Sequence, residues 1–104
     1  HESLISCRAS GGTGHTVDDI TVFDFQRRLA EEEGIFAEPA AAVALAGAAQ
    51  AMAADELDPD SNIVCLVTGS GFKDASSIDR INTDREAPLV ESLEEFETIV
   101  RAII

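Results

Sequence analysis

Positively charged and large aromatic side chains are scarce in this sequence, and both shortages exclude classes of partner. Seven Lys and Arg residues stand against 20 Asp and Glu residues, for a formal net charge of −13, and Trp and Tyr are absent. Nucleic acids and anionic membrane surfaces require basic groups on their partner, and single-stranded nucleic acids are also bound on aromatic platforms. We therefore expect neither a nucleic-acid partner nor a membrane partner.

Patterns typical of membrane spans and metal sites are also missing. No apolar run reaches the length of a bilayer span, and we find no signal peptide. The two cysteines, Cys7 and Cys65, are far apart in the sequence, and neither they nor His1 and His15 have the spacing of metal ligands. We expect no metal site, and we expect both cysteines to remain thiols in a reducing cytoplasm.

Helix signals, in contrast, are abundant. Asp18 is a favourable N-cap residue, and Gly34 is suited to the position that follows a helix. Between them Val22, Phe25 and Leu29 recur at helical spacing, which predicts an amphipathic helix of about four turns.

A second helix is expected to begin at Pro39, whose backbone is already set for the first helical turn. The alanine-rich run that follows, through residue 54, predicts a helix packed closely on its neighbours. Ser92 and Glu95 form a capping-box pattern at the start of a last helix. Further elements are expected at residues 2–10 (helix), 75–81 (helix), 82–88 (irregular surface stretch) and 92–104 (helix).

Two segments predict strands, residues 14–17 and 63–67. The second is a run of five apolar residues that ends in Thr68, Gly69, Ser70 and Gly71, typical of a buried strand leading into a tight loop. The glycines permit a positive φ or a close approach of the backbone to a ligand. Two strands alone are marginal in water, so we expect an α/β fold in which this chain is part of a larger parallel sheet.

A glycine cluster, Ser10-Gly11-Gly12-Thr13-Gly14, has two interpretations. A phosphate-binding loop should open directly into a helix, whose first amides hold the anion. Here His15-Thr16-Val17 predicts a strand instead, so we favour a turn followed by an edge strand.

Two motifs carry a resemblance to a known family. The pattern Thr-Gly-x-Gly-x-Lys-Asp at residues 68–74 resembles the C-terminal cofactor loop of fold-type II pyridoxal-phosphate enzymes. The segment Glu-Gly-Ile-Phe-Ala-Glu-Pro-Ala at residues 33–40 resembles a second motif of these enzymes, in the same order along the chain. The resemblance extends over residues 11–79 and is strongest to the threonine synthases.

This resemblance implies a fold, a cofactor and a reaction. The chain, residues 1–104, would be the C-terminal portion of the parallel-sheet large domain of the tryptophan synthase beta-like fold. The implied enzyme is a cytoplasmic, homodimeric, pyridoxal-phosphate-dependent lyase that converts O-phosphohomoserine, a small amino-acid phosphate, and water to threonine and phosphate. The lysine that forms the covalent imine with the cofactor is expected upstream, so no catalytic residue is assigned here.

Four residues are expected to contribute to the cofactor site. The resemblance places the Thr68 hydroxyl against the pyridine nitrogen, Gly69 and Ser70 in the cofactor loop, and Glu38 in the polar lining of the pocket. Two alternatives remain: the Thr68 hydroxyl caps a backbone group, and Glu38 only stabilises the helix N-terminus, by about 0.3–1 kcal/mol.

Lys73 is the only lysine in the sequence, which suggests an imine lysine. Such lysines need a desolvated site that lowers the pKa, whereas Lys73 follows a glycine loop and precedes Asp74. We interpret both residues as stabilising the loop through an ion pair. Ser70 and Phe72 depart from the family pattern, which leaves substrate choice open between threonine synthase, threonine dehydratase and cysteate synthase. The resemblance argues against the dehydratases, which usually carry a Ser-Gly-Gly-Asn type of loop in place of Thr-Gly-x-Gly-x-Lys-Asp.

A second hypothesis for the chain stands beside the enzyme. The same residues are compatible with an independent, small, acidic α/β module that binds a ligand or a partner without catalysis.

Overall fold

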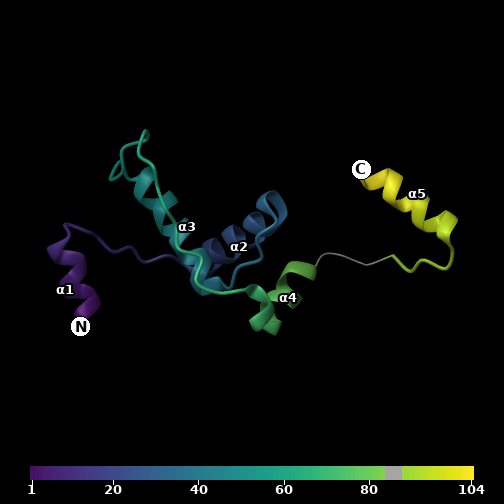
Figure 1. The fold of residues 1–104 in the computed structure, drawn as a ribbon, viewed down its shortest axis with the longest axis horizontal. Coiled ribbons are helices and arrows are strands. Elements are labelled where there is room, and N and C mark those ends of the chain that lie inside the picture. The colour runs from purple at the N-terminus through teal and green to yellow at the C-terminus, as the bar shows by residue number, and fades with distance from the viewer. Residues whose placement is uncertain (84–87) are drawn as a thin grey trace.

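The computed structural model describes residues 1–83 and 88–104. These ranges form α1 (Glu2–Ala9), α2 (Asp19–Glu33), α3 (Pro39–Ala53), a short 3-10 helix η1 (Gly71–Lys73), α4 (Ala75–Asn82) and α5 (Leu93–Ile103). Figure 1 shows α2, α3 and α4 in the middle of the molecule, with α1 and α5 at opposite ends. The radius of gyration is 18.4 Å, against about 13 Å for a compact domain of this length.

Both ends of α2 are set by the residues that the sequence predicted. The Asp18 side chain accepts a hydrogen bond of 2.9 Å from the Thr21 backbone N–H, which satisfies one of the free amides of the first turn. Gly34 ends the helix with a φ of +70°, in the left-handed region that glycine adopts without a steric cost. The prediction of this helix is confirmed.

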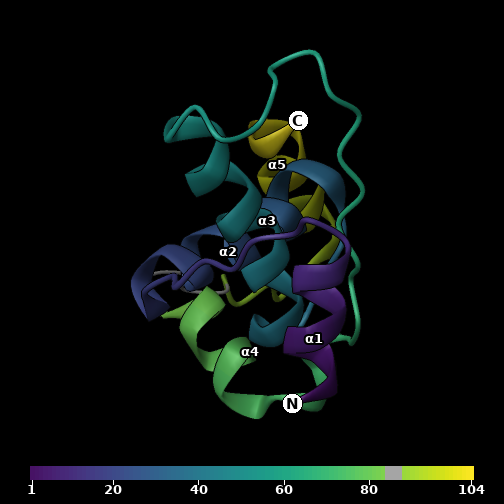
Figure 2. The ribbon, with the colours of Figure 1, turned by 90° about the vertical axis from the view of Figure 1, so that its left-hand side faces the viewer.

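The second predicted helix, α3, packs on α2 and supplies most of the core. It begins at Pro39 as expected and ends at Ala53, one residue earlier than predicted. Figure 2 shows α2 and α3 crossing at the centre of the molecule. The contact is built from small side chains, which let the two backbones approach closely: one cluster holds Val22, Ala42 and Ala46, and the other holds Leu29, Ala37 and Ala41.

The remaining predicted helices, at residues 2–10, 75–81 and 92–104, are confirmed as α1, α4 and α5. At α5, Ser92 Oγ accepts a hydrogen bond from the Glu95 N–H, and the Glu95 carboxylate accepts one from the Glu91 N–H. In the usual capping box the Glu side chain bonds the N–H of the N-cap residue, which here is Ser92. In this structure Glu95 bonds the N–H of Glu91, one residue earlier. Of the predicted irregular stretch 82–88, residues 84–87 lie outside the described part of the chain.

The predicted strands at 14–17 and 63–67 are wrong for this structure. Across residues 1–83 and 88–104, the β-pairing is limited to an isolated antiparallel bridge between Ala37 and Ser70. A strand requires hydrogen bonds to a neighbour, and the described chain supplies none beside either segment. The apolar side chains of the second segment are accordingly open to solvent, with Val64 90% and Leu66 76% exposed. The parallel sheet expected from the sequence is therefore absent from the described residues.

None of the helices in the described part of the chain is both long enough and apolar enough to cross a membrane.

Replacing Gly34 by alanine tests the end of α2. A Cβ at this position meets no atom within 4 Å, so the cost is conformational alone. We expect the free energy of unfolding to fall by about 1–2 kcal/mol, because an L-residue is strained in the left-handed region. Chemical denaturation measures this. Gly14→Ala is the matched control, since its Cβ also meets open space and its φ is not positive. Equal effects of the two substitutions would contradict the prediction.

Candidate functional site

The two motifs of the sequence lie side by side in the structure. The Glu38 N–H donates to the Gly69 carbonyl at 2.9 Å, and the Gly71 N–H donates to the Phe36 carbonyl at 2.9 Å. These two bonds flank the bridge between Ala37 and Ser70. Segment 36–38 and loop 69–71 thus form a short antiparallel pair, although about 30 residues separate them in the sequence.

Thr68 and Glu38 meet through their side chains at one end of this pair. Thr68 Oγ1 donates a hydrogen bond of 3.3 Å to Glu38 Oε1. Glu38 is the N-cap residue of α3, but its carboxylate makes no capping bond and turns instead to the loop. Thr68 is exposed, and its hydroxyl is bound to a side chain rather than to the backbone group of the alternative interpretation. Both predicted site residues therefore present oxygen atoms to the same surface.

The glycines of the loop are required for close approach. A Cβ on Gly69 would overlap the Glu38 carboxylate, and a Cβ on Gly71 would lie 2.6 Å from the Phe36 ring. Positive φ among the described glycines is confined to Gly11 and Gly34. Neither loop glycine has the positive φ that glycine permits, and both leave room for side chains of this chain, Glu38 at Gly69 and Phe36 at Gly71. The predicted close approach of the loop backbone to a ligand stays a prediction.

Ser70 and Phe72 complete the loop. Ser70 Oγ accepts a hydrogen bond of 3.3 Å from the Phe72 N–H and so caps η1. The Phe72 ring packs edge-to-face on Phe36, with 5.0 Å between ring centroids. The Ser70 side chain therefore stabilises the loop. The bridge between Ser70 and Ala37 places Ser70 near Glu38 and Thr68.

Asp74 has a different partner from the one expected. Its carboxylate caps α4 by accepting hydrogen bonds from the Ser76 N–H and hydroxyl and from the Ser77 hydroxyl, and it pairs with Arg80 at 3.2 Å. The hydrogen bonds from Ser76 and Ser77, followed by the one from Arg80, lower the pKa of Asp74 to about 2. The predicted ion pair with Lys73 is wrong, because the cap turns Asp74 toward α4 while Lys73 remains exposed.

Sequence reasoning missed Gln26, which the structure places behind the site. It is 1% exposed, and it is one of the two largest side chains that are fully buried in the described chain, together with Ser77. Gln26 Nε2 donates to the Ala37 carbonyl at 2.7 Å and to Ser77 Oγ at 2.9 Å. The spacing in the sequence indicates that this side chain is buried. Gln26 lies four residues after Val22 and three before Leu29, which places it on the buried face of α2.

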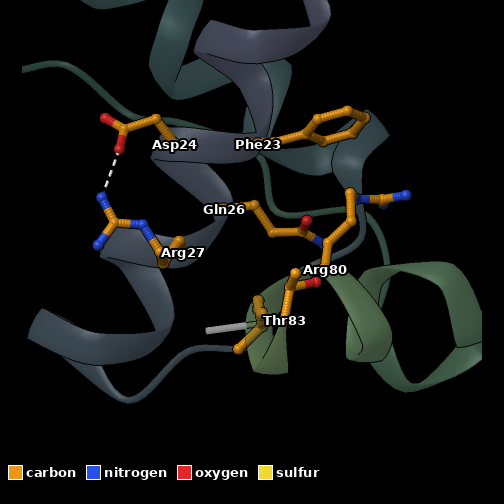
Figure 3. Close-up of a pocket in the computed structure, with 7 residues that line it drawn as sticks. Phe23, Asp24, Gln26, Arg27, Arg80 and Thr83 are labelled. Atoms are coloured by element: carbon orange, nitrogen blue, oxygen red, sulfur yellow. Dashed lines mark hydrogen bonds and ion pairs between the residues drawn. The ribbon is translucent and has the colours of Figure 1, made fainter. Parts of the chain in front are cut away.

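A pocket of about 410 Å³ opens beside Gln26, between α2 and α4. In Figure 3, Gln26 points from α2 toward Arg80 of α4. The Arg80 guanidinium lies 4.0 Å from the centre of the Phe23 ring, and Arg27 is paired with Asp24 at 2.6 Å. The lining residues are Phe23, Asp24, Gln26, Arg27, Arg80, Ile81 and Thr83. Both cations of this pocket already have carboxylate partners.

Metal ligands are not gathered at this surface. In the described ranges, no three His, Cys, Asp or Glu side chains are placed to hold a metal ion.

Comparison with known proteins decides the family. Residues 2–69, well over half of the chain, match the family described as pyridoxal-phosphate dependent enzyme. The chain belongs to this family. The matched range contains the Glu38 segment and ends at Gly69, so the antiparallel pair described above lies at its C-terminal limit.

The similar curated proteins are mostly threonine synthases. The chain is 36% identical to that of Methanocaldococcus jannaschii over 83 residues, which are 80% of this chain and 20% of the relative. It is 40% identical to that of Synechocystis over 67 residues, which are 64% of this chain and 17% of the relative. An L-threonine dehydratase of Mycobacterium bovis is 41% identical over 61 residues. The chain thus spans about a fifth of the length of the threonine synthases it matches.

The described residues fit one end of the family's cofactor, pyridoxal phosphate. An exposed hydroxyl on Thr68, held by a carboxylate, is a suitable partner for a pyridine nitrogen, and the lack of a side chain at Gly69 leaves room beside it. Family membership establishes the cofactor, pyridoxal phosphate.

The lowered pKa of Asp74 predicts a pH dependence of stability. Since the folded-state pKa is about 2 and the ordinary value is 3.8, this carboxylate stabilises the fold above pH 4. That contribution is lost as the pH falls from about 4 to 2, because the unfolded chain then binds the proton more readily. The difference in free energy of unfolding between wild type and Asp74→Asn should shrink over this range. Asp79→Asn, an exposed change in α4, controls for net charge. A constant difference from pH 5 to pH 2 would contradict the assignment.

Replacing Gly69 by alanine tests the contact between the loop and Glu38. The added methyl group must displace the Glu38 carboxylate, which is the mobile end of a flexible side chain, and so separate it from Thr68. We expect weaker binding of pyridoxal phosphate to the complete enzyme, by about tenfold for one lost charge-assisted hydrogen bond. Cofactor titration measures this. Gly71→Ala is the comparison, since its methyl group meets the Phe36 ring and should mainly lower the melting temperature. Unchanged cofactor affinity in Gly69→Ala would be the contrary result.

Proposed function

We propose that this chain is the C-terminal part of a threonine synthase-type lyase and supplies the pyridine-nitrogen side of its cofactor pocket. The proposed reaction converts O-phosphohomoserine and water to threonine and phosphate. The observation that carries the proposal is the hydrogen bond between Thr68 and Glu38, which joins the two family motifs at an exposed surface.

The protein's part in the chemistry is to position a neutral donor. Bound pyridoxal phosphate withdraws electrons from the carbon atoms of an amino-acid substrate. Thr68 would face its ring nitrogen, and a hydroxyl does not enforce protonation of that nitrogen as a carboxylate would. Without cofactor, Glu38 accepts the single hydroxyl proton of Thr68 and so fixes the orientation of its side chain. On this proposal that proton turns from Glu38 to the ring nitrogen when the cofactor binds. Gly69 has no side chain that would crowd Glu38 at this point. The Ser70 hydroxyl stabilises the loop by accepting a hydrogen bond from the Phe72 N–H.

The exposed apolar side chains favour this proposal over an independent binding module. Val64 and Leu66 are largely exposed, as is Leu93 on the apolar face of α5. A self-contained domain would cover such residues in its own core, whereas the remainder of a larger enzyme can supply the missing strands of a parallel α/β sheet. On this proposal the chain by itself is inactive, because the covalent lysine and the phosphate cradle belong to the rest of the enzyme.

The oligomeric state and compartment of the proposed enzyme are those that the resemblance to the threonine synthases implies. We propose a homodimer in the cytoplasm, and the free thiols of Cys7 and Cys65 are compatible with a reducing compartment.

Dehydration of threonine is the second candidate reaction, because an L-threonine dehydratase is among the similar proteins. Assays with O-phosphohomoserine and with threonine distinguish the two reactions.

Substituting Thr68 by valine in the complete enzyme tests the cofactor contact. Valine keeps the shape of the side chain and removes the hydroxyl, so we expect about tenfold weaker cofactor binding and a shift in the cofactor absorption band. The fold should be preserved, since Thr68 is exposed. Absorption spectra and equilibrium dialysis measure both effects.

Thr68→Ser is the matched control, because it retains the hydroxyl and should retain the spectrum. A Thr68→Val enzyme with the wild-type spectrum, cofactor affinity and turnover would refute the pyridine contact.

A further inference from the structure

Segment 36–38 makes hydrogen bonds along both of its edges. Loop 69–71 provides the partners along one edge only. In an extended segment, the backbone groups of alternate residues point to opposite edges. The Phe36 carbonyl and the Glu38 N–H both point to the loop, where they bond Gly71 and Gly69. The Ala37 carbonyl points to the other edge, where a third strand would place an N–H donor.

The Gln26 side chain occupies that position. Its Nε2 lies 2.7 Å from the Ala37 oxygen, in a buried contact between residues 11 apart in the sequence. The second proton of the same amide is directed to Ser77 Oγ at 2.9 Å, in α4. One side-chain amide therefore bonds the segment before Glu38 and the helix that follows the loop.

Ser77, the second partner of Gln26, is also fixed by its own contacts. Ser77 is fully buried, and its hydroxyl donates to the Asp74 carboxylate at 2.6 Å. Arg80 donates to both Ser77 Oγ at 2.9 Å and Asp74 Oδ2 at 3.2 Å. Gln26 of α2 is therefore connected to both segments of the antiparallel pair. It bonds Ala37 of segment 36–38 directly, and it reaches Asp74, which follows η1 and the loop, through Ser77.

We propose that Gln26 is a positioning residue, which sets the register of segment 36–38 against loop 69–71 and thereby places Glu38 and Thr68 for the cofactor. The part of this inference that concerns the cofactor rests on the proposed function; the part that concerns the register does not. Gln26 acts through the Ala37 carbonyl and touches neither Glu38 nor Thr68.

Two substitutions separate hydrogen bonding from packing. Gln26→Glu keeps the shape of the side chain, but a carboxylate has no donor for the Ala37 carbonyl or for Ser77 Oγ, whose single proton goes to Asp74. Gln26→Met keeps the length and removes both donors. Gln50→Met is the matched control, because Gln50 is an exposed glutamine of the neighbouring helix α3.

Hydrogen exchange in the complete enzyme without cofactor is the first measurement. We expect the peptides that contain the Glu38 and Gly71 amides to exchange about tenfold faster in both Gln26 variants, as for the loss of one buried hydrogen bond. Peptides from residues 43–53 of α3 should exchange at the wild-type rate, and Gln50→Met should change neither set. Wild-type exchange at Glu38 and Gly71 would overturn the positioning role, and so would a uniform increase across all peptides.

Cofactor binding in the same proteins is the second measurement. We expect Gln26→Glu to weaken pyridoxal-phosphate binding about three- to tenfold and to shift its absorption band, with little further effect in a Thr68→Val background. Faster exchange with unchanged cofactor affinity would preserve the positioning role and overturn the proposed cofactor contact. Unchanged exchange together with a spectral effect of Thr68→Val would do the reverse.

The two Gln26 variants also cover the case in which one of them does not fold. If Gln26→Glu does not fold, Gln26→Met decides, because it keeps the length of the side chain and places no charge at this buried position. If neither variant folds, the side chain is required for the fold as a whole and the local positioning role is overturned.

Discussion

Two backbone hydrogen bonds, between Glu38 and Gly69 and between Gly71 and Phe36, are the constraint on which the candidate site depends. They bring together two motifs that share no local contact along the chain. The pairing is possible because Gly69 and Gly71 carry no side chain where the Glu38 carboxylate and the Phe36 ring approach. Everything polar at the site, including the contact of Thr68 with Glu38, follows from this register.

The helices could be predicted because their signals are local. Asp18, Gly34 and Pro39 act within one turn of their own positions, so the sequence around each is sufficient to define where α2 and α3 begin or end. The strands could not be predicted in the same way. An apolar run such as residues 63–67 specifies only a preference, and a strand exists where a neighbour accepts its hydrogen bonds, which the described chain does not supply.

The structure brings the motif residues of the candidate site together, but their contacts could not be predicted from the sequence. Thr68, Gly69, Ser70 and Glu38 were identified from motifs, whereas their mutual arrangement depends on chain reversal between α3 and the loop. Asp74 shows the limit of reasoning from adjacency, because the cap of α4 turns it to Arg80 and away from its neighbour Lys73. Gln26 was overlooked because a buried amide is identified by its partners, which lie 11 and 51 residues away.

The exposed segment at residues 61–68 has a consequence for self-association of the chain. From Ser61 to Phe72 there is neither a charged residue nor a proline, and the apolar run at its centre resembles the short, neutral, β-prone stretches that stack into aggregates. Asp58 and Asp60 on one side, and Lys73 and Asp74 on the other, act as charged gatekeepers that oppose stacking of identical copies. Charge on both sides of the exposed apolar run therefore opposes self-association of the chain.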